Sequence, residues 1–389
     1  MVTTRWHTGM EEIPRDEWNR LATLLPTPLL EWDWLYCLEA SKSIAPRHGW
    51  VPTHLTCYRN GKLVAAVPLY IRNQSMGEFV FDFALVDVAE QIGIRYYPKL
   101  VGMSPATPST AFRFLIDPEE DEEEISREIL EAIFERAREV GCRAVQFNYV
   151  EPEFRSTLAR AGFTEWRHQG FLWENDGFTD FDDYLAIFRK NQRRNIRRER
   201  ASMGEQELEV RLYQGTEIPP SYFTRMAEYY HKTNDQFGPW AARFLNSRFF
   251  GLLEERFRDR IAMVAALDSD SGGEDDPLAL SFLLVKNETI LGRYWGTREY
   301  RDNLHFNVCY YEPINWAIRN GYNRFDPGMG SSHKIRRGFR AVANYSHHYF
   351  LDERMQAIFR ANIDRINRYE EENIRLLNEN LPLKEAAGR

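Results

Sequence analysis

One polar stretch of this sequence, from Phe325 to Phe339, concentrates the residue types that could do chemistry. Asp326 and His333 can each accept a proton, so either is a candidate general base. The small residues of the stretch allow a close backbone approach and offer N–H groups to an anion; they include Gly328, Gly330, Ser331 and Ser332. Its basic side chains suit a phosphate or a carboxylate; they are Lys334, Arg336 and Arg337. The stretch predicts an anion-binding site, and the alternative is a surface loop followed by a basic turn.

Well-known catalytic motifs are absent from the sequence. It contains no G-x-S-x-G nucleophile elbow and no G-x-x-x-x-G-K-[ST] phosphate loop. None of its nine histidines has the spacing of a metal-binding motif. These absences argue against a triad hydrolase, a P-loop enzyme and a zinc enzyme, and we expect no metal.

Two further positions could contribute to a site. Asp82 lies within an otherwise apolar run, Phe79 to Asp87. Its carboxylate is expected either to be buried and paired or to line a cleft, where burial would raise its pKa as a general base requires. His305 opens a predicted helix and would either cap that helix or contact substrate.

A predicted helix from Phe181 to Met203 carries an unusual density of positive charge, concentrated between Arg189 and Arg200. Such a face could contact a polyanion, for example tRNA or a nucleotide pyrophosphate. The alternative is a solvated face that balances an acidic remainder.

The first half of the chain has the pattern of an α/β unit. Two β-rich runs flank Asn60-Gly61, which is a strong hairpin signal. Further elements follow in order: strands at Glu78–Leu85 and Phe112–Ile116, a long loop at Ile92–Thr110 between them, a helix at Pro118–Val140, and strands at Ala144–Tyr149 and Phe163–Trp173. We expect this unit to end near residue 175.

The second half echoes this element order. Its predicted elements are helices at Pro220–Lys232 and Ala241–Phe257, strands at Ile261–Leu267, Leu278–Val285 and Thr289–Trp295, a helix at His305–Asn320, and strands at Tyr322–Asp326 and Tyr345–Leu351. The polar stretch thus begins at the carboxyl end of a strand, where open α/β sheets bind ligands. We predict a duplicated α/β chain with domains at 1–175 and 176–352, followed by a terminal segment, 353–389, whose helix packs on its own chain or on a second copy.

Composition indicates a soluble protein. The chain has 389 residues, is 43% hydrophobic and carries a formal net charge of -8. This apolar content suffices for two cores. No apolar run reaches the roughly 18 residues of a membrane span, and the N-terminus has no signal-peptide pattern. We therefore expect a cytoplasmic protein with no membrane insertion.

Several blocks of the sequence resemble the bacterial "peptidoglycan biosynthesis/recognition" family of predicted N-acyltransferases. The blocks are Gly49–Leu55, Glu78–Asp82, Tyr96–Leu100, Lys190–Arg200, Gly292–Gly296, Leu304–Phe306, Cys309–Tyr311, His333–Phe339 and Tyr345–His348. That family is similar to the Fem-type aminoacyl transferases, so the resemblance implies two tandem GNAT-like domains. It also implies acyl transfer to an amine, such as that of a cell-wall precursor or a small metabolite, from acyl-CoA or an aminoacyl-tRNA.

In such a fold, position and chemistry suggest roles for individual residues. Asp326 or His333 would be the base, Tyr345 an acid for the leaving group, and the basic residues anion anchors. Arg293, Trp295 and His305 would contact substrate. One departure stands out: Ser332 occupies the position where the family has glutamate, and the common acetyl-CoA motif is missing. Two alternatives to a general N-acyltransferase are a tRNA-dependent aminoacyl transferase that grips tRNA through Arg189–Arg200, and a non-catalytic protein that recognises a peptidoglycan precursor.

Overall fold

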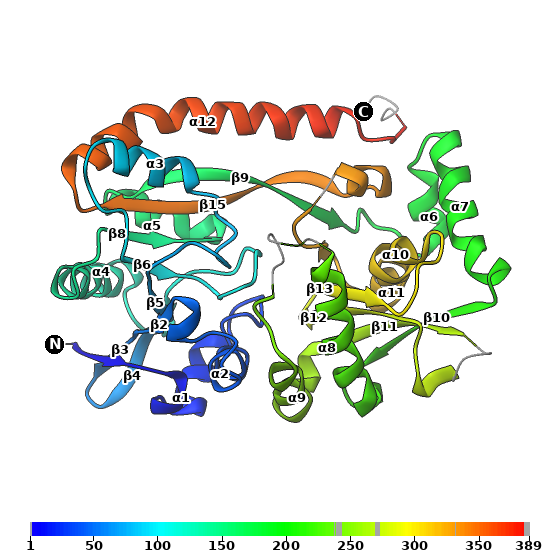
Figure 1. The fold of residues 1–389 in the computed structure, drawn as a ribbon, viewed down its shortest axis with the longest axis horizontal. Coiled ribbons are helices and arrows are strands. Elements are labelled where there is room, and N and C mark those ends of the chain that lie inside the picture. Colours follow the sequence, from blue (N-terminus) through cyan, green and yellow to red (C-terminus); the bar gives the residue numbers. More distant parts are fainter. Residues whose placement is uncertain (1, 237, 239–242, 269–272, 331, 385–389) are drawn as a thin grey trace. The chain divides into compact units, whose positions relative to one another are not determined.

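The computed structural model describes residues 2–236, 238, 243–268, 273–330 and 332–384. The chain divides into two compact units (Figure 1). Unit 1 comprises Met1–Gln169 and Ala343–Glu372, and unit 2 comprises Gly170–Val342 and Asn373–Arg389. The division passes through two long strands, β9 (Thr164–Glu174) and β15 (Arg340–Phe350), and through the terminal helix α12 (Glu353–Glu379).

Unit 1 contains two sets of strands. One follows the order β1-β3-β4-β7 and the other β15-β8-β6-β5-β2. Their bounds are β1 Thr3–His7, β2 Trp50–Pro52, β3 His54–Arg59, β4 Lys62–Val67, β5 Leu69–Arg72, β6 Lys99–Gly102, β7 Leu115–Ile116 and β8 Ala144–Phe147. Asn60 and Gly61 both have positive φ in the β3–β4 turn, so the predicted hairpin is confirmed. Pairing is antiparallel throughout, except that β6 and β8 are parallel.

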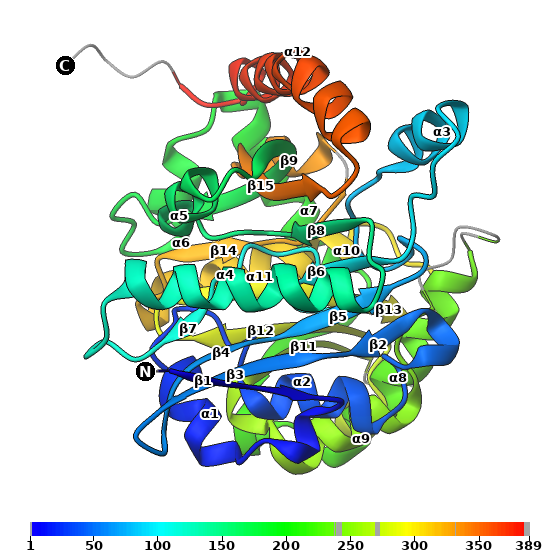
Figure 2. The ribbon, with the colours of Figure 1, turned by 90° about the vertical axis from the view of Figure 1, so that its left-hand side faces the viewer.

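The helices of unit 1 are α1 Arg15–Ala22, α2 Trp32–Ala40, α3 Phe83–Gln91, α4 Glu122–Glu139 and α5 Arg155–Arg160. Helix α4 begins at Asp121, whose carboxylate accepts hydrogen bonds from the N–H groups of Glu123 and Glu124. Its buried face contributes Ile125, Ile129 and Ile133 to a core shared with β6 and β8, and Figure 2 shows the helix lying across the strands. Regular helical spacing of these isoleucines accounts for this packing.

Unit 2 is built on the strand order β10-β11-β12-β13-β14-β9. The bounds of its other strands are β10 Leu208–Gln214, β11 Ile261–Asp268, β12 Ala279–Lys286, β13 Thr289–Thr297 and β14 Arg324–Asp326. Its helices are α6 Phe181–Ala186, α7 Lys190–Glu205, α8 Pro220–Asp235, α9 Ser247–Arg256, α10 Leu304–Phe306 and α11 Glu312–Asn320, and a π-helical turn at Asn307–Tyr311 joins the last two. Strand β12 is buried along its whole length, which matches its continuous apolar sequence.

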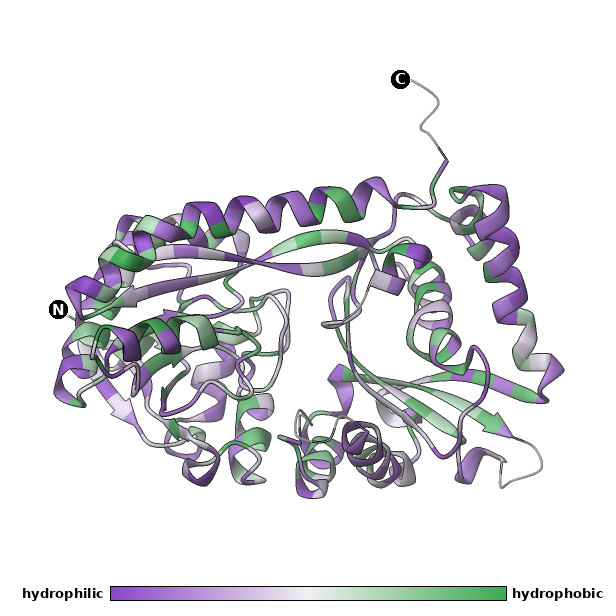
Figure 3. Ribbon diagram, turned by 45° about the horizontal axis from the view of Figure 1, so that its top comes forward, coloured by the Kyte–Doolittle hydropathy of each residue, from purple (hydrophilic) through white to green (hydrophobic). Residues whose placement is uncertain are grey.

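Helices α12 and α7 bury only a few of their side chains. Helix α12 buries Met355, Gln356, Phe359 and Ile363 in its first half only, and it is largely hydrophilic in Figure 3. Helix α7 is also hydrophilic along most of its length (Figure 3) and buries Ile196, Ser202 and Met203. Among the described residues, no helix combines the length and apolar character that a membrane crossing requires.

Several predicted elements were wrong. The strand expected at Glu78–Leu85 is an irregular segment followed by helix α3, because buried ion pairs fix Glu78 and Asp82 in place of a strand ladder. The loop expected at Ile92–Thr110 contains β6. The helix expected at Phe181–Met203 is two helices, since the backbone is extended at Arg189. Part of the helix expected at Ala241–Phe257 lies outside the described residues, and α9 begins at Ser247 after its N-cap, Asn246.

Candidate functional site

The two parallel strands of unit 2 separate soon after they pair. Strands β13 and β14 are matched from Thr289 and Arg324 to Leu291 and Asp326. Strand β14 then ends, while β13 continues to Thr297 along β12. The β12–β13 register shifts and passes over Arg293, which is a β-bulge. A partly buried segment of β13 therefore lies without β14 beside it.

Glycine is needed on both sides of this divergence. A Cβ on Gly328 would lie 2.9 Å from the carbonyl oxygen of Gly292, and Gly328 has φ +79°. Its N–H donates to Asp326 Oδ1 at 2.7 Å, which holds the turn after β14. A Cβ on Gly292 would lie 3.2 Å from the Phe325 ring. The backbones can approach this closely only because neither residue has a side chain.

Charged groups at the divergence do not balance. Arg293 Nη2 lies 3.2 Å from Asp326 Oδ2, and the Arg293 side chain is 2% exposed. The buried Lys334 ammonium donates to the carbonyl oxygen of Gly328 at 2.7 Å. Burial lowers the pKa of Lys334 to about 8, Asp326 opposes this change and Arg293 adds to it. Two cations thus share one carboxylate, so an anion or a developing oxyanion would be stabilised here.

Two histidines with neutral rings, His333 and His305, belong to the same part of unit 2 as Lys334. The distance between His333 Nε2 and the Tyr310 hydroxyl oxygen is 3.0 Å. Burial, with the charges of Arg337 and Lys334, lowers the pKa of His333 to about 4. Burial also lowers the pKa of His305 to about 3, and its ring lies 4.4 Å from the Trp295 ring and 5.8 Å from the His333 ring. The N-cap of α10 is Asn303, so His305 does not cap its helix.

Arg337 and Arg336 contact residues of helix α7, unlike Lys334. The Arg337 guanidinium lies 2.8 Å from Glu199 Oε2 and 3.3 Å from the centre of the Phe306 ring, and its side chain is 3% exposed. Glu199 also accepts from the Tyr311 hydroxyl. Arg336 is exposed, and its carbonyl oxygen accepts from Gln192 Nε2 at 2.7 Å. These contacts tie the basic segment to α7, which leaves Lys334 and Arg293 as the cations beside Gly328.

The other small residues of the polar stretch are more exposed. Gly330 has φ +137°, and a Cβ there would lie 3.3 Å from Lys334 Nζ. Ser332 is exposed at the start of a 3-10 helix, Ser332–Arg337. Ser331 lies outside the described residues.

Asp82 and Tyr345 belong to unit 1, whereas the residues above belong to unit 2. Asp82 Oδ2 lies 2.6 Å from Lys99 Nζ and accepts from the hydroxyls of Ser75 and Tyr96. Lys99 also contacts Glu78 at 2.8 Å, so this fully buried network balances its charges together with Arg72. Tyr345 lies under the Arg155 guanidinium, 3.7 Å from the ring centre.

Metal ligands are not gathered anywhere in the described part of the chain. No group of three or more His, Cys, Asp or Glu side chains is placed there to hold an ion. Tyr310 and Glu199 were not singled out from the sequence, because each contacts a residue that is distant along the chain: Tyr310 contacts His333, and Glu199 contacts Arg337. The only hint was their position within blocks that resemble the family.

Comparison with known proteins identifies the family. A FemAB-like family model, described as peptidoglycan biosynthesis/recognition, matches residues 9–385. The chain belongs to this FemAB-like family. No curated protein sequence matches the chain.

Solved structures share the fold of this FemAB-like chain. FemX is 12% identical and has a TM-score of 0.56, over 92% of this chain and 99% of its own. The C-terminal domain of a putative lysylphosphatidylglycerol synthetase from Agrobacterium fabrum is 11% identical, with a TM-score of 0.53, over 90% and 95%. A conserved protein of unknown function from Bacteroides thetaiotaomicron is 9% identical, with a TM-score of 0.51, over 89% and 99%. The predicted class, an α/β chain of two tandem GNAT-like units with a long C-terminal helix, is confirmed.

The two units of the FemAB-like chain differ where their parallel strands end. In unit 1, Phe112 forms an isolated parallel bridge with Val150 just beyond β8. A Cβ on Gly102, the last residue of β6, would lie 2.4 Å from the Phe112 ring and 2.7 Å from the Phe147 ring. Aromatic side chains thus occupy the end of this strand pair. In unit 2 the corresponding place holds Gly328 and the Lys334 ammonium.

Proposed function

We propose that this protein is an N-acyltransferase that moves an acyl or aminoacyl group from an activated ester or thioester to an amine. The acceptor would be a cell-wall precursor, in keeping with the FemAB-like family, or a small metabolite. The observation that carries this proposal is the divergence of β13 and β14 beside the buried Lys334. Aminolysis needs a positioned carbonyl, a stabilised oxyanion and an amine that loses a proton, and this part of unit 2 offers groups for each.

The carbonyl of the donor would lie along the segment of β13 that follows Leu291. The backbone at the Arg293 bulge is not matched to a residue of β12, so it is suited to orient that carbonyl. As the amine attacks, negative charge develops on the carbonyl oxygen. The excess positive charge of Lys334 and Arg293 over Asp326 would stabilise it, and burial strengthens this effect.

His333 is the better of the two predicted bases. Its pKa of about 4 keeps the ring unprotonated at pH 7, which is the form that a base needs. Its contact with Tyr310 orients the ring. Asp326 is already engaged by Arg293 and by the N–H of Gly328. Collapse of the intermediate would then break the bond to the donor's oxygen or sulfur, and a proton would pass to that leaving group.

The donor is either an acyl-CoA or an aminoacyl-tRNA. The missing acetyl-CoA motif and the exposed cations of α7, which include Arg194, Arg197 and Arg198, support the tRNA-dependent alternative. A cytoplasmic location, where both donors are found, fits either one. The long helix α12 would be the contact surface if two copies associate.

Donor binding tests the proposal. The unfolding temperature should be measured with a panel of acyl-CoAs and with charged tRNAs. A ligand present at about 100 times its Kd adds roughly 2.7 kcal/mol of stability and should raise the midpoint by a few degrees. Lys334→Met should abolish the shift, whereas Arg340→Met, which removes an exposed cation of β15, should keep it. Saturable binding of a precursor without any turnover would instead support the recognition protein.

A further inference from the structure

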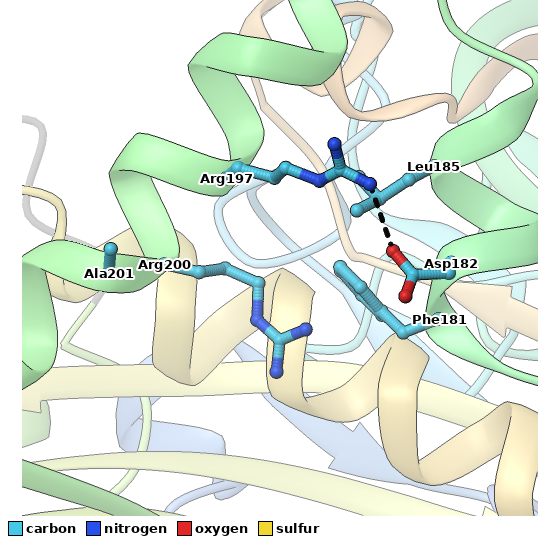
Figure 4. A pocket seen from close by; sticks show the side chains of 6 residues that line it. All are labelled: Phe181, Asp182, Leu185, Arg197, Arg200 and Ala201. Atoms are coloured by element: carbon cyan, nitrogen blue, oxygen red, sulfur yellow. Dashed lines mark hydrogen bonds and ion pairs between the residues drawn. The ribbon is translucent and has the colours of Figure 1, made fainter.

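A hollow on unit 2 lies between helices α6 and α7, apart from the divergence of β13 and β14 to which acyl transfer is assigned. Its volume is about 390 Å³, and it is open to the surface. Phe181, Asp182 and Leu185 line it from α6, and Arg197, Arg200 and Ala201 line it from α7 (Figure 4). The helices hold these side chains in a fixed arrangement, because Phe181 and Leu185 are anchored in the core of unit 2.

Arg200 is the unusual group in this hollow. Its guanidinium carbon lies 3.9 Å from the centre of the Phe181 ring, which fixes the plane of the group. The nearest carboxylate, that of Glu312, is 3.9 Å away, which is too far for a hydrogen bond. Burial lowers the pKa of Arg200, and the carboxylates of Glu312 and Asp182 oppose this change. A half-buried guanidinium therefore keeps N–H groups that no carboxylate in the described structure satisfies at hydrogen-bonding distance.

The charge around the hollow favours an anion. Arg197 pairs with Asp182 at 3.1 Å, but both side chains are largely exposed, at 59% and 79% (Figure 4). Such an exposed pair is weak and can rearrange. Further cations extend from the hollow along α7; they are Arg193, Arg194 and Arg198. The acidic residue among them, Glu199, is engaged by Arg337.

The geometry points to a phosphate-binding site in this hollow, formed by Arg200 and Arg197, for a phosphorylated small molecule or for the phosphate of an RNA backbone. Two guanidinium groups can each present paired N–H donors, which match the oxygens of a phosphate. Phe181 holds Arg200 in position for this contact. A membrane surface fits less well, because α7, all of whose residues are described, exposes no large apolar side chain.

Binding of defined phosphates tests this site separately from acyl transfer. Inorganic phosphate, pyrophosphate and a short single-stranded RNA should be titrated into the full-length protein at about 0.15 M salt and followed by calorimetry. Arg200→Met and Arg197→Met should each weaken binding by about tenfold or more, the value of a charge-assisted hydrogen bond. Arg340→Met, which removes an exposed cation of unit 2 outside the hollow and outside α7, should change the Kd less than about threefold. Lys334→Met should leave this binding intact.

Equal losses from Arg340→Met and Arg200→Met would overturn the site, because they would show only diffuse attraction to the positive charges of unit 2. The absence of saturable binding by any of the three probes would do the same. Tight binding of RNA with weak binding of pyrophosphate would identify a nucleic-acid backbone as the source of the phosphate, and the reverse would identify a small molecule. If Arg200→Met does not fold, Arg200→Lys keeps the charge but loses the paired donors, and it should still weaken binding. Full binding by this lysine variant would contradict the proposal.

Discussion

The surroundings of Lys334 change the pKa of its side chain strongly. Its pKa falls from 10.5 to about 8, mainly through burial. Between these two values the unfolded chain binds more protons than the folded chain, so this group makes the protein more stable as pH rises. The unfolding midpoint in urea should therefore increase less between pH 8 and 10 in Lys334→Met than in the original protein. Identical pH dependence in the two proteins would show that Lys334 titrates normally.

For single residues, the sequence predicted which side chains could take part in chemistry better than it predicted which groups those side chains contact. The density of Asp326, His333 and Lys334 in one stretch was visible without a structure. The Tyr310 contact of His333 and the Gly328 contact of Lys334 depend on how the chain folds back. The pairing of Asp82 with Lys99 was one of two outcomes expected for a carboxylate in an apolar run.

A largely buried ion pair contributes to the attachment of helix α7. Glu199 accepts from Arg337 and from Tyr311, and Arg337 has almost no access to water. Glu199→Ala would leave the buried Arg337 charge without its carboxylate partner, which costs about 3–5 kcal/mol of unfolding free energy. Urea unfolding should show this loss, while Glu205→Ala, at an exposed position of the same helix, should change stability by less than about 0.5 kcal/mol. A similar small effect for both variants would contradict the role of the pair.

Elements with regular periodicity were predicted well and irregular ones were not. Strands β11 and β12 follow from largely apolar runs. The segment before α3 was misread as a strand, since apolar residues there alternate with Asp82 and Glu78, whose ion pairs were not visible in sequence. The bulge at Arg293 leaves no trace in the residue pattern.

Buried histidines make the whole molecule sensitive to acid. Burial lowers the pKa of His168, His333 and His347 to about 4 and that of His305 to about 3, and it also lowers that of His348. Below the ordinary value of 6.5 the unfolded chain takes up these protons first, so stability falls as pH drops from 6.5 towards 4. The unfolding temperature, measured by calorimetry, should fall steeply through this window. A constant unfolding temperature between pH 6.5 and 4.5 would contradict these shifts.

The duplicated architecture could be predicted from element order, but the difference between the two units could not. Phe112 lies outside both β6 and β8 along the chain, and only the fold brings it against Gly102. The same holds for the contact of Lys334 with Gly328, which distinguishes unit 2. The position of the proposed site in unit 2 therefore rests on long-range packing, whereas its residue types could be predicted from sequence.

Formation of an amide product tests the central claim most directly. The protein should be incubated with a donor that raises its unfolding temperature and with amine acceptors that include a cell-wall precursor, and the acylated amine should be measured by mass spectrometry. Loss of a general base costs about 10²–10⁴-fold in rate. We therefore predict product from the original protein and from Arg340→Met, and a loss of this size in His333→Ala. Full rates in both His333→Ala and Lys334→Met would contradict acyl transfer at this divergence of strands.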